Sequence, residues 1–522
     1  MPLPVANSPW PPPGHERAQQ IYRECWAWYS GDSNLLAALY QGGSGYPGYQ
    51  GPAVRPSQYS GGLRGMVARL FWGLPPTAGQ RQSKLHIPVA GDIATASADL
   101  LFGEPVTLTV SDKATQARLD EIMTSAGVRA SLREGAELAA ALGGVYLRAG
   151  LDIARAEHPI VDAVPADTAV PEWAGRTLAA VTFWRILDVE AGRWGTTAIW
   201  RHLERHEPGG RVYHGLYQGT ETSLGRPMPL SERPDTAYLA DQVDQLGGIS
   251  LGTEGLGVVY LPNAYPNKVL RGSSLGRSDY TPAVIGMMDA LDEMWSSWLR
   301  DIRTGKSMLL VPDSYLKSNG PGKGAQFDPE QEIFRGMNMI DHPDSTRDMI
   351  TQVQFSIRVE EHERSTAALF KQICRSAGYS PSTFGEHEEG GVATATEVDA
   401  RKDQSNVTRE KKIDYATPAL AQLARILLDI DRTRFGTTVT PQRPTVEFPD
   451  RVTPDPEQLA RTLQLLDAAR AISTRIKVRM LHPDWDDKDI EAEVALIEKE
   501  TAPPPVVDPV AGLRAAARTD DE

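Results

Sequence analysis

The chain has 522 residues, enough for two to four domains or one elaborated structure, and 41% of them are hydrophobic. Its formal net charge is −14, from 54 basic and 68 acidic residues. This balance argues against a general nucleic-acid-binding protein, which presents a net basic surface, but not against a protein that touches DNA at a few positions.

The two cysteines, Cys25 and Cys374, lie far apart, so they form neither a disulfide framework nor a metal-ligand spacing. A reducing compartment is the default expectation. The proline-rich stretch 1–15 lacks the apolar centre of a signal peptide, and no run of about 18 apolar residues exists. We therefore expect no metal, no cofactor and no membrane partner.

The first part of the chain predicts an extended, mobile arm over 1–15 and a long loop over 42–62, rich in Gly, Tyr, Ser and Pro. Apolar spacing predicts helices at 17–41, 89–102, 114–126 and 128–142. Alternation and turn residues predict strands at 106–110, 144–149, 159–165, 177–189, 195–205, 211–217 and 258–262. Residues 220–256 show no clear period and are predicted to be loop.

Residues 281–304 have the clearest helical periodicity, with Thr281 as a plausible N-cap, Pro282 at the first position and Gly305 at the end. Apolar residues recur at steps of three and four and predict a packing stripe: Val284, Met288, Leu291, Trp295, Trp298 and Ile302.

The next segments predict short strands at 308–311 and 333–340, separated by a turn-rich stretch, and then a helix over 346–377 that ends at Gly378. A polar helix over 394–431 follows, and Pro418 should kink it or begin a new segment. The remainder predicts a strand with turns at 436–450, helices at 455–472 and 487–500, and a disordered acidic tail over 501–522.

Between the predicted helices 346–377 and 394–431 lies an acidic loop that contains Gly385, Glu386, His387, Glu388, Glu389, Gly390 and Gly391. Glycines at both ends allow it to move, and its carboxylates resist burial and repel other anions. In isolation such a loop would more simply be a solvated turn. It also suits a surface that a polyanion must pass without binding.

Two motifs resemble catalytic signatures without matching them. Thr304-Gly305-Lys306-Ser307 looks like the end of a P-loop, but Arg300 stands where the pattern needs glycine, and a helix end explains it better. The segment His202-Leu203-Glu204-Arg205-His206 has the wrong order for a zinc protease. On a strand, His202 and His206 share a face, which permits weak metal binding, although a solvated sheet edge is the simpler explanation.

Several segments, in their order and spacing, resemble the portal proteins of tailed bacteriophages. Gly276-Arg277-Ser278-Asp279-Tyr280-Thr281-Pro282 is similar to the start of that family's first stem helix, and 377–385 to its turn towards the tunnel loop. Thr394-Ala395-Thr396-Glu397-Val398 resembles the start of its tunnel-lining helix, and 84–110 resembles the opening of its wing domain. The late helices at 455–500 are also similar, so the resemblance covers most of 80–500.

The resemblance implies an α+β portal-type fold with a mixed α/β wing, a long-helix stem, a small β clip, a tunnel loop and helix, and a C-terminal helical crown region. The implied parts are an N-terminal arm and helix, partly disordered (1–62), the wing (63–275), the first stem helix (276–305), the clip (306–345), the second stem helix (346–384), the tunnel loop (385–393), the tunnel helix (394–434), the wing/crown helices (435–500) and a disordered tail (501–522).

The resemblance also implies a structural, non-enzymatic protein of the virion, present in the host cytoplasm during assembly. It would form a ring, usually of twelve copies, at one capsid vertex. The residues themselves also predict a closed cyclic oligomer, because one subunit can hardly cover the one-sided apolar stripes of 281–304 and 346–377 alone. Its partners would be double-stranded DNA, the terminase large subunit, a major capsid or scaffold protein and a head–tail adaptor. The implied channel residues are those of the acidic loop together with Thr394, Thr396, Glu397, Arg401 and Lys402.

Two other classes remain open from the sequence. One is a hydrolase or nuclease of unrecognised type that uses Asp and Glu residues with His202 and His206. The other is a capsid-associated adaptor, although such adaptors are generally much shorter than this chain.

Overall fold

The computed structural model describes residues 3–40, 85–151, 156–191, 197–245, 247–304, 308–312, 334–337, 351–353, 358–386, 395–449, 456–469, 471–482 and 485–501. The chain divides into two compact units, Met1–Pro449 and Asp450–Glu522, and each is described by itself. Among the helices in the described ranges, none is long and apolar enough to cross a membrane.

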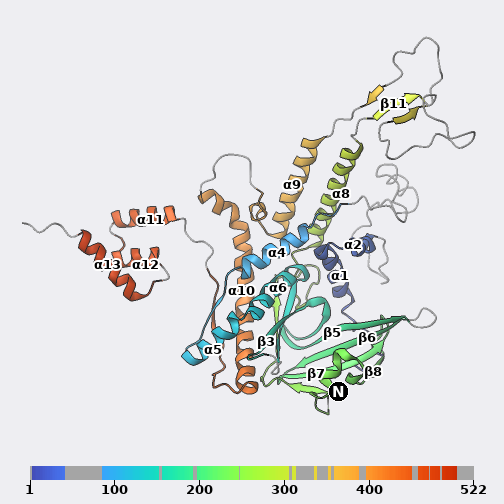
Figure 1. The fold of residues 1–522 in the computed structure, drawn as a ribbon, viewed down its shortest axis with the longest axis horizontal. Helices are drawn as coiled ribbons and strands as arrows, with labels where there is room; N and C mark the ends of the chain where they lie inside the picture. The colour runs from blue at the N-terminus through green and yellow to red at the C-terminus, as the bar shows by residue number, and fades with distance from the viewer. Residues whose placement is uncertain are drawn as a thin grey trace, which may run out of the picture. The chain divides into compact units, whose positions relative to one another are not determined.

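The larger sheet of the first unit is antiparallel, and in the described residues its strand order is β4-β5-β6-β7-β8, with β9 also paired to β7 (Figure 1). Its long central strands alternate apolar and polar residues, and Gly175 and the pair Gly209 and Gly210 lie in the described turns after β4 and β6. The bounds are β4 Ala169–Ala174, β5 Thr177–Ala191, β6 Thr197–Glu207, β7 Arg211–Gly219, β8 Arg226–Met228 and β9 Gly248–Ser250.

The smaller sheet of this unit places β2 (Gly144–Gly150) between β10 (Val258–Pro262) and β3 (Ile160–Pro165). Successive residues of a strand face opposite sides, and here the two sides of β2 enter different cores. Val145 and Leu147 pack in a core that includes α10, whereas Tyr146 packs in a core with α1 and α8. The sheet therefore connects the helices on its two sides.

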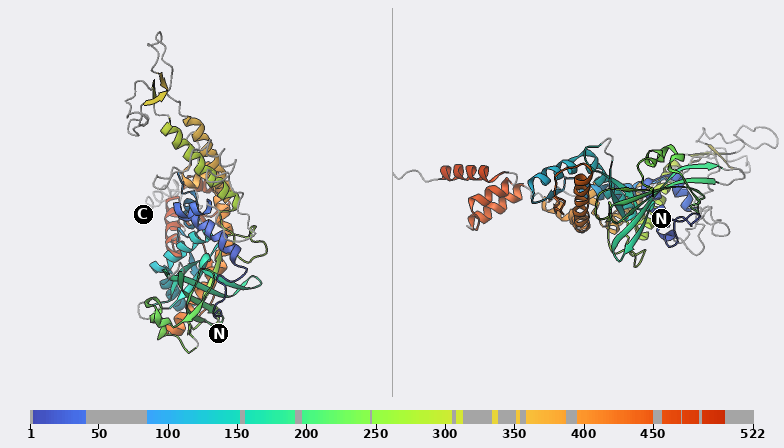
Figure 2. Two further views of the ribbon diagram at one scale, coloured as in Figure 1. Left: turned by 90° about the vertical axis from the view of Figure 1, so that its right-hand side faces the viewer. Right: turned by 90° about the horizontal axis from the view of Figure 1, so that it is seen from below.

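Helices α6 and α10, from widely separated parts of the sequence, pack against this sheet, and the other helices of the unit extend the cores around it (Figures 1 and 2). The helix bounds are α1 Glu16–Ser30, α2 Ser33–Tyr40, α4 Val89–Phe102, α5 Lys113–Thr124, α6 Ala126–Leu142, α8 Pro282–Thr304, α9 Val359–Ala377 and α10 Ala395–Arg434. A short pair, β1 (Thr107–Thr109) and β14 (Thr445–Glu447), joins the segment after α4 to the segment after α10.

The N-terminal arm differs from its prediction as mobile chain. Trp10 is only 3% exposed and packs against Leu203, Tyr217 and Leu224 of the larger sheet and its β7–β8 turn. The backbone adds hydrogen bonds, including Leu224 N to the carbonyl of Ser8 at 2.9 Å. The sequence predicted an extended arm, and the buried tryptophan together with these hydrogen bonds holds it against the larger sheet.

Two further segments also differ from prediction. Residues 220–256, expected to be loop, contain β8, β9 and the helix α7 (Pro234–Ala240). The helix expected from 346 begins only at Val359, because β13 (Thr351–Val353) pairs antiparallel with β11 (Met308–Pro312), which also pairs with β12 (Phe334–Met337). The β-branched Thr351 and Val353 favour that strand.

Helix α10 is continuous over 40 residues and contains Pro418. At 1.5 Å per residue it is about 60 Å long. Pro418 therefore does not divide it into two helices, although the proline ring removes one backbone hydrogen-bond donor at this point.

The second unit contains α11 (Pro456–Ala468), α12 (Thr474–Leu481) and α13 (Asp487–Thr501), of which α12 was not predicted. Ser473 caps α12, and its side chain accepts from the backbone N–H of Ile476. Lys477 of α12 pairs with Asp467 at 2.7 Å, and Arg479 pairs with Asp487.

Candidate functional site at the junction of α8, α9 and α10

Helices α8 and α9 pack side by side (Figure 1). Of the apolar stripe on α8, Val284, Met288 and Leu291 are at most 2% exposed, whereas Ile302 is 46% exposed. Near the far end, the Trp298 ring lies against Trp295 at 4.9 Å and stacks on His362 of α9 at 5.8 Å. His362 Nε2 also lies 2.9 Å from Asp301, and this hydrogen bond lowers the pKa of the Asp301 carboxyl.

The first turns of this stripe are thus covered within one chain. The expectation that one subunit can hardly cover them is wrong for Val284, Met288 and Leu291. Because this part of the α8 stripe is already buried within one subunit, it provides no argument that subunits associate.

Helix α9 ends at Gly378, whose φ of +100° is the left-handed conformation that favours glycine. The turn that follows is held by polar side chains of α10. Thr408 Oγ1 donates to the carbonyl of Gly378 at 2.5 Å, and the Ser405 hydroxyl accepts from the backbone N–H of Ser380 at 2.8 Å. The start of the acidic loop is therefore anchored to α10.

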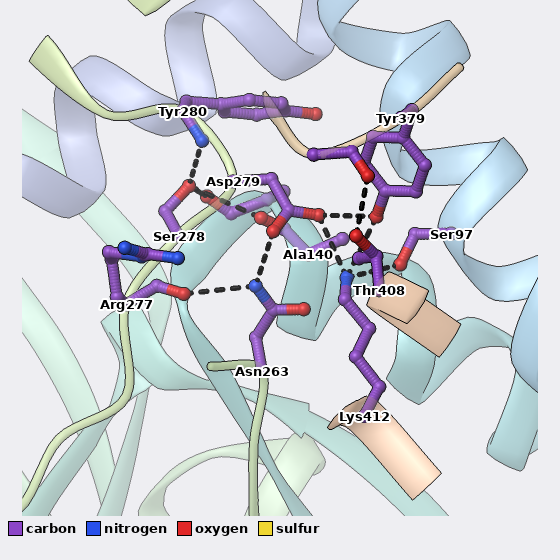
Figure 3. A network of polar contacts seen from close by, with 12 residues as sticks. Ser97, Ala140, Asn263, Arg277, Ser278, Asp279, Tyr280, Tyr379, Thr408 and Lys412 are labelled. Carbon is purple, nitrogen blue, oxygen red and sulfur yellow. Dashed lines mark hydrogen bonds and ion pairs between the residues drawn. The ribbon is translucent and has the colours of Figure 1, made fainter. Parts of the chain in front are cut away.

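A buried polar network lies beside this turn (Figure 3). The ammonium of Lys412 on α10 donates to Asp279 Oδ2 at 2.8 Å, to Tyr379 OH at 2.9 Å and to Ser97 Oγ at 2.6 Å. Tyr379 OH donates to the same carboxylate oxygen at 2.8 Å, and Asn263 Nδ2 donates to the other at 2.8 Å. The network connects α4, the segment before α8, the turn after α9, and α10.

The side chains of this network are almost inaccessible to solvent: Lys412 is 6% exposed, Asp279 5% and Tyr379 0%. Burial lowers the pKa of Lys412, and the neighbouring Asp279 carboxylate acts in the opposite direction. Burial raises the pKa of Tyr379 well above its usual value, and Asp279 reinforces this. Tyr379 is therefore a neutral hydrogen-bond donor to the carboxylate.

The network residues were not predicted as a site, although a signal for Lys412 exists in the sequence. Lys412 continues the same helical face as the buried Ala416, Leu420, Leu423 and Leu427. A lysine on the buried face of a helix needs an acidic or hydrogen-bonding partner that is buried with it. The partner Asp279 lies 133 positions earlier in the chain, so local spacing cannot reveal it.

The predicted channel residues are described only in part. Gly385 has φ +81°, which suits its place at the end of the short 3-10 turn Pro381–Phe384, and Glu386 is exposed. Residues 387–391 and Thr394 lie outside the described residues. Thr396, Glu397, Arg401 and Lys402 belong to the first turns of α10.

The histidines proposed for the enzymatic alternative are not on a solvated edge, as the simpler explanation had it. His202 and His206 lie in the central strand β6 and are 5% and 1% exposed. His202 Nε2 is 3.2 Å from His214 Nδ1, and His206 Nε2 is 2.7 Å from Glu204, which also accepts from Arg148 at 2.7 Å. These contacts connect β6 to β7 and to β2.

Across the described residues, no group of three or more His, Cys, Asp or Glu side chains is arranged to hold a metal ion. Most of the P-loop-like motif, 305–307, lies outside them. The most polar buried sites are thus ion-pair and hydrogen-bond networks between elements.

Comparison with known proteins resolves the class. Residues 78–503 match the sequence family described as "Phage portal protein, SPP1 Gp6-like". The chain belongs to this phage portal protein family. It is accordingly a structural portal protein of the virion, with a mixed helix and sheet fold.

Solved structures of gene transfer agent (GTA) particles are distantly similar. A chain of the native GTA virion has 14% identity and a TM-score of 0.37, covering 80% of this chain and 98% of that one. Chains from the neck of the native and of the empty GTA particle each have 13% identity, with TM-scores of 0.38 and 0.40. Both matches cover 78% of this chain; they cover 89% of the chain from the native neck and 95% of the chain from the empty neck. No curated protein sequence matches.

Proposed function

We propose that this portal protein assembles into a closed ring, of twelve copies, at one vertex of the capsid. Double-stranded DNA passes through the ring during packaging and ejection. The terminase large subunit, a capsid or scaffold protein and a head–tail adaptor dock on it. The observation that carries this proposal is the family match over 78–503.

The geometry of the first unit supports this function. Helices α8, α9 and α10 converge on one junction, and the acidic loop begins there at Gly385 and the exposed Glu386. Repeated around a ring, Glu386, Glu388 and Glu389 form a dense negative collar. Because DNA affinity grows with each phosphate that a cation neutralises, such a collar keeps the passing duplex from binding.

The enzymatic alternative receives no support from the described residues. Its two histidines are buried in a sheet and occupied by His214 and Glu204. ATP hydrolysis during packaging is therefore assigned to the terminase partner.

The first test is the assembly of the purified full-length protein. Mass photometry and negative-stain images should reveal a ring with a central hole. A stable monomer at every protein and salt concentration would overturn the proposal.

The second step replaces Glu386, Glu388 and Glu389 together with Lys. The ring should still form, because a charged, glycine-flanked loop is expected to contribute little to packing. The variant should retain double-stranded DNA in filter binding, with an affinity that decreases steeply as salt increases, and should package more slowly. If the triple variant assembles normally and packages DNA at the wild-type rate, the loop does not face the DNA. Asp414→Lys, at an exposed position of α10, is the matched control outside the acidic loop.

A further inference from the structure

The two described parts of α10 are held in different ways. From Ala416 onward its inner face is apolar, with Leu420, Leu423 and Leu427 fully buried. From Gln404 to Lys412 the contacts are polar: Gln404 Nε2 donates to the carbonyl of Arg375 at 3.0 Å, and Ser405, Thr408 and Lys412 bind the turn after α9. The direction of this polar half is thus set by hydrogen bonds.

Helix α4 provides a second set of fixed points. Lys412 binds Ser97, and Arg409 Nε donates to the carbonyl of Leu100 at 2.9 Å. The positions advance by one turn on each helix in opposite directions, so the two helices are antiparallel at this contact. Arg409 also donates to the carbonyl of Pro449 at 2.6 Å and is 5% exposed.

We propose that Lys412, assisted by Arg409, is a positioning residue that fixes the register of α10 against α4, Asp279 and Tyr379. Asp279 is the reason that only one register is acceptable. A shift of α10 by one turn would bring Thr408 or Ala416 to the position of Lys412. The buried carboxylate would then lack its cation, and an unpaired buried charge is strongly unfavourable.

A buried charged pair is suited to fixing the register of a helix, because it selects one arrangement of the two helices more than it increases their stability. Buried ion pairs contribute little net stability compared with apolar residues of similar size, but removal of one partner is costly. An apolar side chain at 412 would extend the stripe of Leu420 and Leu423 and would tolerate neighbouring registers. Lys412 does not, because its ammonium must meet Asp279, Tyr379 and Ser97 together.

This inference rests on the proposed function only in assigning α10 to the channel. It adds that the turn carrying Gly385 and Glu386 is held at a defined place by residues of α10 behind it. The test therefore measures local order in the full-length protein and does not depend on ring formation. Mass photometry of the same samples reports assembly separately.

The experiment is hydrogen–deuterium exchange of the full-length wild type, Lys412→Met, and the matched control Lys411→Met, which changes an exposed lysine one position away. In Lys412→Met, amides of 379–383 and 404–411 should exchange faster by on the order of a hundredfold, while those of 419–430 keep their protection. The control should match the wild type. Unchanged protection in Lys412→Met would overturn the proposal.

The double variant Lys412→Met with Asp279→Asn separates positioning from charge balance, because it leaves no unpaired charge. We expect its thermal midpoint to approach that of the wild type, while 404–411 remain fast-exchanging. If protection of 404–411 returns, or if 419–430 exchange equally fast, the network serves stability alone and the proposal fails. This variant also carries the test if Lys412→Met does not fold.

Discussion

The imidazoles of His202 and His214 stack in the larger sheet with ring centres 5.3 Å apart. Burial, and then the neighbouring His214, lower the pKa of His202 to about 3 from an ordinary value of 6.5. Burial also lowers the pKa of His214. Both rings therefore stay neutral in the folded protein at pH values where the unfolded chain takes up protons.

This difference makes the stability of the larger sheet acid-sensitive. Above about pH 6.5, His202 is neutral in both the folded and the unfolded state, so its titration does not change the free energy of unfolding. Below that pH, the unfolded chain is protonated at His202 while the folded protein is not, so the folded state loses stability. Each such histidine should lower the free energy of unfolding by about 1.4 kcal/mol per pH unit, until the pH approaches the folded pKa. Urea titrations at several pH values should give a smaller slope for His202→Gln than for wild type. An identical slope would refute this, and exposed His482→Gln is the control.

At the same residue scale, the sequence showed which side chains were unusual but not which partners they had. Periodicity placed His202 and His206 on one face of a strand, and both are buried. It could not show that Arg148, from β2, supplies the charge beside Glu204. The same holds for Lys412 and Asp279, because tertiary partners are set by packing between distant segments.

At the scale of elements, the N-terminal arm depends on one aromatic anchor. Trp10→Ala should release the arm, because the side chain fills a site among Val170, Leu203 and Leu224, with a cost of about 3–5 kcal/mol. Faster exchange of the Leu224 amide, which binds the Ser8 carbonyl, would report the release. Val5→Ala, at a position 78% exposed, should leave that amide protected. Equal exchange in both variants would exclude Trp10 as the anchor.

Long elements with a strong period were predictable, as were the short strands β1, β10 and β11, whereas other short elements were not. The predicted ranges for α4 and for β5 to β7 lie close to those observed, because 14-residue helices and long alternating strands carry enough pattern. β13, β8 and β9 have three residues each, so their pairing partners determine them. Helix α12, with eight residues between Ser473 and His482, was hidden for the same reason.

At the scale of the whole molecule, we expect no ATPase, nuclease or metal-dependent activity from the isolated protein. The broken P-loop spacing at Arg300 and the occupied His202 and His206 give the reason. Turnover assays with ATP and with DNA, with and without divalent cations, check it. A turnover that survives purification and is abolished by Lys306→Ala or His202→Ala would contradict the prediction.

The core that includes Leu420, Leu423 and Leu427 of α10 has most of its other members between positions 98 and 163. During synthesis those apolar residues leave the ribosome well before the helix that covers them. The chain from 163 to 416 is then still to be made, which at on the order of 10 residues per second takes about 25 s. Throughout that interval the nascent chain exposes an unfinished apolar surface. We therefore expect slow translation or truncation before α10 to cause aggregation, and chaperones that bind apolar segments to raise the yield.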